Sequence, residues 1–374
     1  MKITHIETIP VRVPIRPELA IRARAGTHSV SPFLLVRVHT DEQIYGLGEV
    51  SCTPRWSGED QFTAAHFIRT ILEPALTGEN PRDIERLTAR MRGAVAGNPF
   101  TRAALEMALW DILGKSAGLP VYRLLGGPVR DAVPIKWSIS GAEPARAAEI
   151  ARWAVQQGFT TMKVKVGIDP AQDIARVCAV REAIGSDVRL GIDANGAWPP
   201  RTAVRMIRRL TEFGIYFAEQ PVPPGDVAAL ADVRRQVAVP ILADESVYSP
   251  EDALALARAH AADAFSIYTG KAAGIGPARK IAAIAESAIL GATIGSNLEL
   301  GIGTAAMIHL GLSTAGITPD DYPCDIIGPF YYADEILTHP LRLAGGQALP
   351  PEGPGLGVEL DDEKVREYRV SLTP

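Results

Sequence analysis

The chain has 374 residues, which is enough for one large domain and a smaller one. A hydrophobic content of 47% and a charged content of 22% are ordinary for a globular protein, and a formal net charge of −5 argues against a nucleic-acid-binding surface. No apolar run is as long as a membrane span, no signal-peptide core follows Met1, and the three cysteines are too scattered for a disulfide framework. We therefore expect a cytoplasmic protein with no membrane or nucleic-acid partner.

The first part of the chain has the pattern of a small α+β domain. Residues 3–14 alternate as a strand, and residues 33–39 and 45–49 form a predicted hairpin around the turn at 40–42. Helices are predicted at 60–75, 82–93 and 100–117, the last ending at Gly118. We place this domain at residues 1–130.

From Val133 onward the pattern changes to alternating strands and helices. Eight strand candidates lie at residues 135–139, 161–166, 189–193, 215–219, 240–244, 264–268, 292–296 and 322–327. Helices such as 144–157 and 277–288 are predicted between them. Eight parallel strands at this spacing predict a closed α/β barrel over residues 131–340. Residues 341–374 form loops and a short tail, which we expect to return to the first domain.

Three carboxylates end successive strand candidates of the barrel. Asp193, Glu219 and Asp244 are separated by 26 and 25 residues, about the length of a strand with its returning helix. They should therefore converge at the carboxyl ends of neighbouring strands. Any one of them alone could be a helix cap or a turn residue. Together they need a cation, and an all-oxygen set suits Mg²⁺, with Mn²⁺ as an alternative. Asn195 is a natural partner for this set.

Two lysines share one face of the second barrel strand. Lys163 and Lys165 are two residues apart, so both side chains point into the barrel. One interpretation is that they only neutralise the three acids. The other is that one of them is a general base, because a neighbouring positive charge and partial burial lower the pKa of an amine.

Further polar residues lie near the ends of later strands. Glu299 could orient a substrate or a lysine, or could be an exposed acid that opens a helix, and Asp325 is open to the same two interpretations. Tyr268 could be barrel packing, and Lys271 a loop charge, or either could face Lys165 across the site. First-domain residues would contact substrate if that domain covers the barrel mouth, and would otherwise be surface groups: Arg22, Arg24, Arg55 and Trp56.

These motifs together resemble the enolase superfamily, and within it the muconate lactonizing enzyme subgroup. The matching segments are Lys163-Val-Lys165, Asp193-Ala-Asn195, Glu219-Gln-Pro221, Ala243-Asp-Glu-Ser246, Asn98-Pro99 through Trp110-Asp111, Ile327-Gly-Pro329 and Gly353-Pro-Gly-Leu-Gly357. The resemblance implies a modified TIM barrel, (β/α)7β, with an N-terminal α+β capping domain. It also implies metal binding by the three acids, an enediolate intermediate, Lys165 as acid or base and Lys163 beside it. The seventh strand has no histidine, so the mandelate racemase subgroup fits poorly.

The chain departs from this subgroup at the sixth strand. The subgroup has a lysine there and often a second one three residues later, whereas this chain has Tyr268 and then Lys271. Racemisation by two lysines is therefore disfavoured. Lys271 is favoured as the second acid or base, or as a cation near the enediolate, with Tyr268 hydrogen-bonding or packing beside it. We expect a homo-oligomeric, muconate-type cycloisomerase acting on a small carboxylate. The alternatives are a racemase, epimerase or dehydratase of an amino or hydroxy acid (a hydroxyproline or a dipeptide, for example), a Schiff-base aldolase and a non-catalytic binding protein.

Overall fold

The computed structural model describes residues 1–23 and 26–372, with the backbone alone in 21–23 and 26–28. Arg24 lies outside the described residues, as does the side chain of Arg22, so neither the surface role nor the substrate contact considered for these two arginines is placed. Among the described residues, no helix is both long and apolar enough to cross a membrane.

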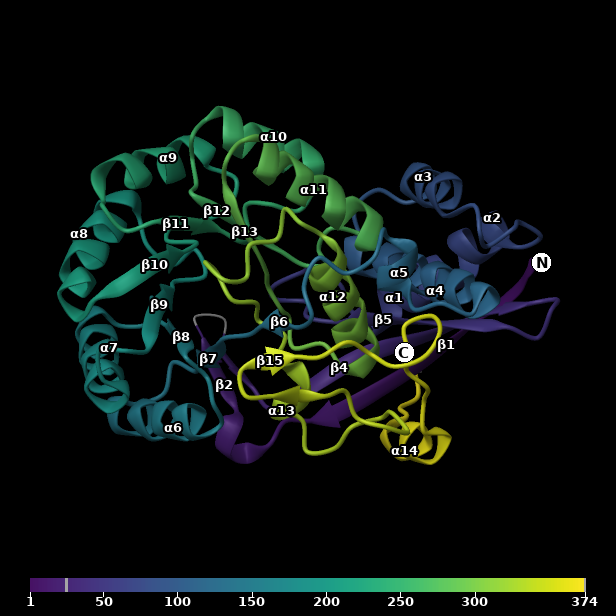
Figure 1. Ribbon diagram of the computed structural model, residues 1–374, viewed down its shortest axis with the longest axis horizontal. Helices are drawn as coiled ribbons and strands as arrows, with labels where there is room; N and C mark the ends of the chain where they lie inside the picture. The colour runs from purple at the N-terminus through teal and green to yellow at the C-terminus, as the bar shows by residue number, and fades with distance from the viewer. Residues whose placement is uncertain (24–25, 373–374) are drawn as a thin grey trace.

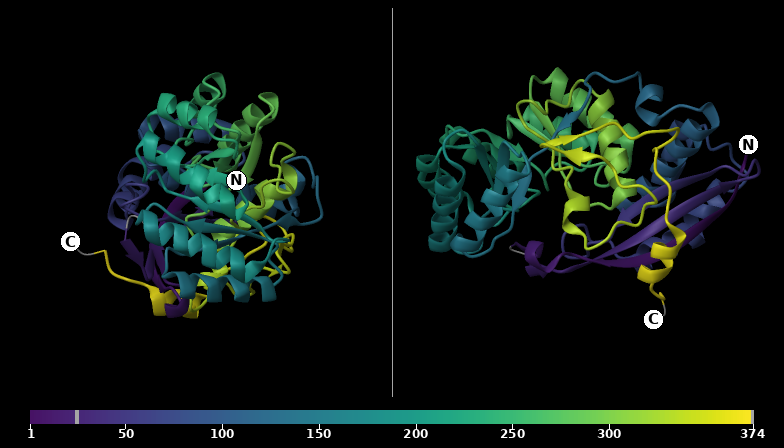
Figure 2. Two further views of the ribbon diagram at one scale, coloured as in Figure 1. Left: turned by 90° about the vertical axis from the view of Figure 1, so that its left-hand side faces the viewer. Right: turned by 60° about the horizontal axis from the view of Figure 1, so that its bottom comes forward.

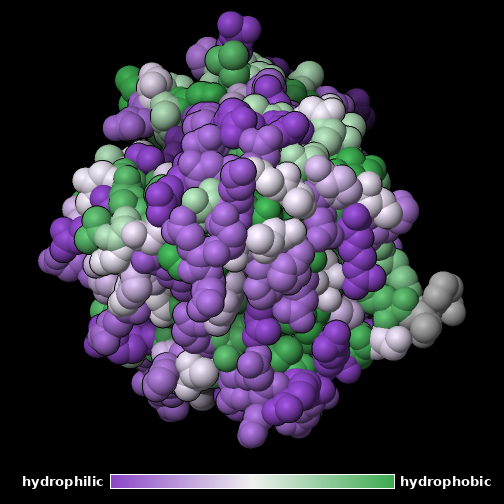
Figure 3. All heavy atoms as spheres, turned by 90° about the vertical axis from the view of Figure 1, so that its right-hand side faces the viewer, coloured by the Kyte–Doolittle hydropathy of each residue, from purple (hydrophilic) through white to green (hydrophobic). Residues whose placement is uncertain are grey.

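The cap domain pairs a three-stranded antiparallel sheet with helices. The sheet has the order β1-β4-β5, and the predicted strand and hairpin are confirmed. Its elements are β1 (Ile3–Pro14), β2 (Ile21–Ala23), β3 (Gly26–His28), β4 (Val30–Thr40), β5 (Tyr45–Ser51), α1 (Gln61–Phe67), the π-helical turn Ile68–Leu72, α2 (Glu73–Leu76), α3 (Ile84–Ala94), α4 (Pro99–Ala117) and α5 (Val121–Leu124). The outer face of this domain is mostly hydrophilic (Figure 3).

Helix α4 packs closely against β5 because two strand positions are glycine. A Cβ atom built on Gly46 would lie 2.0 Å from the carbonyl oxygen of Ala108, and one on Gly48 would lie 1.8 Å from that of Ala104. No side chain fits in that space. The close contact fixes the long helix on the sheet and thereby positions the rest of the cap.

The barrel sheet contains seven parallel strands in the order β13-β12-β11-β10-β9-β8-β7, with helices around the outside (Figure 1). The elements are β6 (Val133–Pro134), β7 (Trp137–Ile139), α6 (Pro144–Gln156), β8 (Thr161–Lys165), α7 (Pro170–Ile184), β9 (Arg189–Asp193), α8 (Pro200–Leu210), β10 (Ile215–Glu219), α9 (Val227–Gln236), β11 (Ile241–Ala243), α10 (Pro250–Arg258), β12 (Ala264–Ile267), α11 (Ile275–Ser287), β13 (Gly291–Ile294) and α12 (Gly301–Ser313). Helix α11 begins two residues before the predicted start at Pro277.

The eighth strand candidate closes the barrel without forming a regular strand. Asp325 N donates to Ile294 O at 2.7 Å on one side, and Lys136 N donates to Cys324 O at 2.8 Å on the other. Only the single bridge between Ile135 and Cys324 is regular in this part of the described chain. A turn in which Ile327 N donates to Asp325 O ends the pairing early. The architecture is the capped, modified TIM barrel that the sequence indicated.

The C-terminal segment crosses back to the cap domain (Figures 1 and 2). After α13 (Gly328–Tyr331), strand β15 (Gln347–Ala348) pairs with both β14 (Leu343–Ala344) and β6. Helix α14 (Asp362–Tyr368) follows, and Val370 N donates to Pro10 O in β1 at 3.0 Å. The tail thus contacts the first domain at β1.

Two buried glutamates of the cap domain also join it to the barrel. Glu49 of β5 accepts hydrogen bonds from the backbone N–H groups of Leu300 and Gly303 at the start of α12. Glu106 of α4 accepts them from Ile275 and Gly276 at the start of α11. Each carboxylate satisfies N–H groups that have no partner within their own helix. The cap domain therefore holds the amino ends of two barrel helices.

Candidate active site

Asp193, Glu219 and Asp244 come together at the carboxyl ends of three neighbouring barrel strands. Asp193 is the last residue of β9, Glu219 the last of β10, and Asp244 follows β11 directly. Strand register places Lys165 and Glu219 on either side of Asp193. All three carboxylates are at most 1% exposed.

The two lysines of β8 lie among these acids. Lys163 Nζ is 2.8 Å from Glu219 Oε1, 3.0 Å from Asp325 Oδ2 and 3.4 Å from Asp193 Oδ2. Lys165 Nζ is 2.5 Å from Asp193 Oδ2 and 3.0 Å from Asn195 Oδ1. The side chain of Lys163 is 4% exposed and that of Lys165 is 17% exposed. Of the two, Lys165 is thus the one that faces the barrel mouth.

Burial and neighbouring charge move the pKa values of the acids in opposite directions. Burial tends to raise the pKa of Asp193, but the ammonium groups of Lys165 and Lys163 outweigh it and lower that pKa to about 2. Burial raises the pKa of Glu219 to about 8. The attraction of Lys163 opposes this rise, and the carboxylates of Asp193, Asp244 and Asp325 add to it. Negative charge at Glu219 is therefore not fully compensated by the side chains around it.

The residues present fit a divalent cation. Four buried carboxylates contact four ammonium groups at 2.5–3.4 Å: Asp193, Glu219, Asp244 and Asp325, with Lys136, Lys163, Lys165 and Lys271. A fifth carboxylate, the partly buried Glu245, is joined to Lys165 through Asn195. Glu219 Oε2 is buried without a hydrogen-bond partner. Within the described ranges, no three His, Cys, Asp or Glu side chains already form a closed ligand set, and several oxygens of the acids instead accept from ammonium groups and a phenol. A hard cation with oxygen ligands would relieve both the excess charge and the unpaired oxygen.

The opposite side of the site carries a phenol rather than a free amine. The Tyr268 hydroxyl donates to Asp244 Oδ2 at 2.8 Å, and its ring stacks on Trp56 with 5.4 Å between centroids. Burial and then the nearby carboxylates raise the pKa of Tyr268 well above its ordinary value, so the phenol stays neutral.

Lys271 is enclosed behind Tyr268. Its ammonium group donates to Asp244 O at 2.6 Å, Asp244 Oδ1 at 2.5 Å and Ser266 O at 2.9 Å, and its side chain is 1% exposed. An ammonium group has three hydrogens, and all three are engaged. This geometry does not fit the expected role of Lys271 as the second acid or base, because no N–H is left to face a substrate.

A hydrogen-bonded chain joins the cap domain to Lys165. Trp56 Nε1 donates to Glu245 Oε1 at 3.1 Å, and Asn195 Nδ2 donates to the same oxygen at 2.9 Å. Asn195 Oδ1 in turn accepts from Lys165. Trp56 thus reaches the barrel mouth, whereas Arg55 beside it is exposed.

The other sequence-based candidates occupy different positions. Glu299 is buried and binds Ser296 Oγ at 2.5 Å and Asn297 N at 3.1 Å, so it stabilises the turn before α12 and is not an exposed acid. Asp325 lies between Lys163 and Lys136. Lys136, fully buried, was missed by the sequence reasoning. Its alternation with the outward-facing Ile135 and Trp137 was a signal that could have revealed it.

Comparisons with known proteins agree with this architecture. The N-terminal domain of the mandelate racemase / muconate lactonizing enzyme family matches residues 3–126, and the enolase C-terminal domain-like family matches residues 145–365. Muconate cycloisomerase 1 of Rhodococcus opacus is 36% identical over 98% of both chains. The crystal structure of N-succinyl Arg/Lys racemase from Bacillus cereus is 32% identical over 99% of both chains, with a TM-score of 0.94. The dipeptide epimerase from Enterococcus faecalis, complexed with Mg and the dipeptide L-Leu-L-Tyr, is 33% identical over 96% of this chain and 99% of its own, with a TM-score of 0.90.

Proposed function

The chain belongs to the mandelate racemase / muconate lactonizing enzyme family of the enolase superfamily, and we propose that it moves the α-proton of a small carboxylate with Lys165 alone. It is an enzyme, and its named relatives are cycloisomerases, racemases and epimerases, all of them isomerases. The observation that carries the proposal is the difference between the two sides of the site. Lys165 faces the mouth on one side, and the neutral Tyr268 stands on the other.

A bound metal would be held by Asp193, Glu219 and Asp244. We infer that it is Mg²⁺, on the basis of the all-oxygen donor set and of the magnesium in the structure of the related dipeptide epimerase. Such an ion supplies Lewis-acid stabilisation of the charge that builds up on a substrate carboxylate when its α-proton leaves. Lys163, bonded to Glu219, Asp325 and Asp193, contributes positive charge beside this position.

The leading reaction is a muconate-type cycloisomerisation. One carboxylate of an unsaturated diacid adds to the double bond within the same molecule, and the α-carbon takes a proton from Lys165. The product contains every atom of the diacid dianion and the one proton donated by Lys165, which solvent then restores to the amine. Only one proton-transfer group is needed. The relatives that are muconate and chloromuconate cycloisomerases support this choice.

The second candidate is a syn elimination of water from an amino or hydroxy acid. Lys165 would take the α-proton and return it to the leaving hydroxyl on the same side. The same observation favours it, because Tyr268 and the enclosed Lys271 leave the other side without a free base. Racemisation and epimerisation, which need proton transfer on both sides, fit less well.

The test is a ¹H NMR screen in D₂O with Mg²⁺, using muconates, hydroxyprolines, N-acyl amino acids and dipeptides. We expect net conversion of one compound class with a single deuterium at the α-carbon, and no conversion by Lys165→Ala. Racemisation of a chiral substrate with exchange on both sides would contradict the proposal. Undiminished turnover in excess chelator would contradict the metal assignment.

A further inference from the structure

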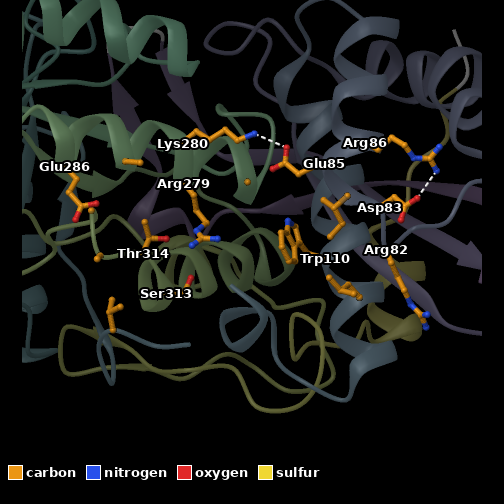
Figure 4. A pocket seen from close by; sticks show the side chains of 17 residues that line it. Arg82, Asp83, Glu85, Arg86, Trp110, Arg279, Lys280, Glu286, Ser313 and Thr314 are labelled. Carbon is orange, nitrogen blue, oxygen red and sulfur yellow. Dashed lines mark hydrogen bonds and ion pairs between the residues drawn. The ribbon is translucent and has the colours of Figure 1, made fainter. Parts of the chain in front are cut away.

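A groove away from the barrel mouth lies between helices of the cap and of the barrel. Its volume is about 800 Å³, and its lining comes from α3, α4, α11 and the segment that follows α12 (Figure 4). None of the candidate active-site residues lines it. Helices α4 and α11, which form two of its walls, are the pair joined by Glu106. Anything bound there would contact both domains.

One arginine in this groove has a guanidinium group that is not engaged in an ion pair with any described residue. Arg279 of α11 is half-buried and points into the groove (Figure 4), and among the described residues it has no ion pair or hydrogen bond. Its neighbours differ, because Lys280 is paired with Glu85 at 3.0 Å and Arg86 with Asp83 at 2.9 Å. A guanidinium group without a partner is suited to a carboxylate, which it can bind through two parallel N–H donors.

A buried hydroxyl group lines the same groove as Arg279. Thr314 is 7% exposed, lines the groove, and its Oγ1 atom has no hydrogen-bond partner. Buried hydroxyls are normally hydrogen-bonded, so the absence of a partner at this atom calls for one. Arg279 and Thr314 both line the groove, and both are labelled in Figure 4. An oxyanion at this place would take donors from both groups.

The rest of the groove is apolar enough for the body of such a ligand. Trp110 and Leu113 of α4 line one wall and Ala283 of α11 lines another. Four cationic and three acidic residues line the groove, so its formal charge is +1 on a chain of net charge −5: Arg82, Arg86, Arg279 and Lys280, with Asp83, Glu85 and Glu286. This local charge favours an anion.

We propose that this groove binds a small carboxylate with a flat apolar body. Its carboxylate lies between Arg279 and Thr314, and its body lies against Trp110. A ligand held this way braces α4 of the cap against α11 of the barrel. The site is separate from the proposed active site and does not depend on the reaction assigned there.

The test is a ¹⁹F NMR titration of the Mg²⁺-loaded protein with 4-fluorobenzoate. We expect saturable binding that weakens by about tenfold or more in Arg279→Met, since a charge-assisted pair is lost, and more modestly in Thr314→Val. Arg258→Met is the matched control, because Arg258 is an exposed arginine at the end of α10 that does not line the groove, and it should bind as wild type. All three variants should keep wild-type turnover.

The probe could also bind at the active-site metal. Such binding is distinguished from binding in the groove because chelator abolishes it, whereas Arg279→Met leaves it unchanged. If Arg279→Met does not fold, the nearly isosteric Thr314→Val carries the test. Wild-type affinity in both groove variants, or no saturable binding that survives chelator, would overturn the proposal. So would a second copy of the chain filling the groove, seen as a loss of mass in Arg279→Met without any change in probe binding.

Discussion

The ammonium group of Lys271 donates to both the backbone carbonyl and the carboxylate of Asp244, at 2.6 and 2.5 Å. The other carboxylate oxygen of Asp244 accepts from the Tyr268 hydroxyl at 2.8 Å. Both residues of the sixth-strand motif therefore act on the same metal-ligand candidate. Lys271 is better described as a positioning residue than as a proton-transfer group.

Replacement of Lys271 should cost more stability than replacement of Tyr268. Lys271→Met leaves Asp244 buried without its ion-pair partner, and we expect a loss of about 3 kcal/mol or more in the free energy of unfolding, with weaker Mg²⁺ binding. Tyr268→Phe removes one hydrogen bond and should cost about 1 kcal/mol. Urea unfolding and Mg²⁺ titration measure both. A stable Lys271→Met variant with unchanged Mg²⁺ affinity would argue against the positioning role.

Removal of one acid should separate metal binding from folding. Mg²⁺ should raise the melting temperature of the wild-type protein, because it binds the native state alone. Glu219→Gln should lose this response and all turnover. In chelator the same variant should be as stable as wild type or more so, because it removes a carboxylate whose pKa burial has raised to about 8. The comparison is made by thermal unfolding with Mg²⁺ and with chelator.

The two sides of the site should be separable by exchange. Lys165→Ala should lower α-proton exchange by about a hundredfold or more, the usual contribution of a general acid or base. Tyr268→Lys places an amine opposite Lys165 and should introduce exchange on that side. Deuterium incorporation into each enantiomer of a substrate, followed by ¹H NMR, reports both effects. Substantial wild-type exchange on the Tyr268 side would show that the single-lysine scheme is wrong.

The stability of the protein should fall on acidification because of His309. This residue of α12 accepts a hydrogen bond from Tyr122 N at Nδ1, and its Nε2 lies 3.1 Å from Leu356 O. Burial lowers the pKa of His309 from 6.5 to about 4, although the carbonyl of Leu356 opposes this. Between pH 4 and pH 6.5 the unfolded chain therefore binds more protons at His309 than the folded protein does. Above pH 6.5 the neutral imidazole of His309 makes its full contribution to the free energy of unfolding. About 3 kcal/mol of this contribution is lost as the pH falls from 6.5 to about 4.

The matched measurement uses His309→Gln, whose amide cannot take up a proton in this range. Its unfolding free energy should vary less steeply between pH 6.5 and 4 than that of wild type. His66→Gln, at an exposed histidine of α1, should retain the wild-type slope. Equal slopes in all three proteins would contradict the assignment to His309.

The sequence identified those site residues that are both chemically suited to the site and placed by the regular period of a strand. Asp193, Glu219 and Asp244 follow apolar strands at equal intervals, and alternation places Lys163 and Lys165 inside the barrel. Side-chain direction beyond a strand was not predictable in the same way. Lys271 turns back to Asp244, and Glu299 turns to its own loop, because both lie in irregular backbone that has no period.

Contacts between distant segments were also beyond local patterns. The hydrogen bond from Trp56 to Glu245 joins residues 189 positions apart, and only the packing of the cap on the barrel brings them together. Lys136 shows the opposite case. Its alternation was visible, but no neighbouring motif drew attention to it, and only its contact with Asp325 ties it to the site.

The glutamates that join the cap to the barrel bear on how enzymes of this architecture diversify. A chimaera that combines the cap of one relative with the barrel of another must keep acceptors at the positions of Glu49 and Glu106. Otherwise the N–H groups of Leu300, Gly303, Ile275 and Gly276 are buried without acceptors. Exchange of whole domains would thus lower stability at two interdomain contacts, that of Glu49 with α12 and that of Glu106 with α11. Substitutions within loops, such as the one that carries Trp56, keep both interdomain contacts and can therefore change substrate specificity at a smaller loss of stability.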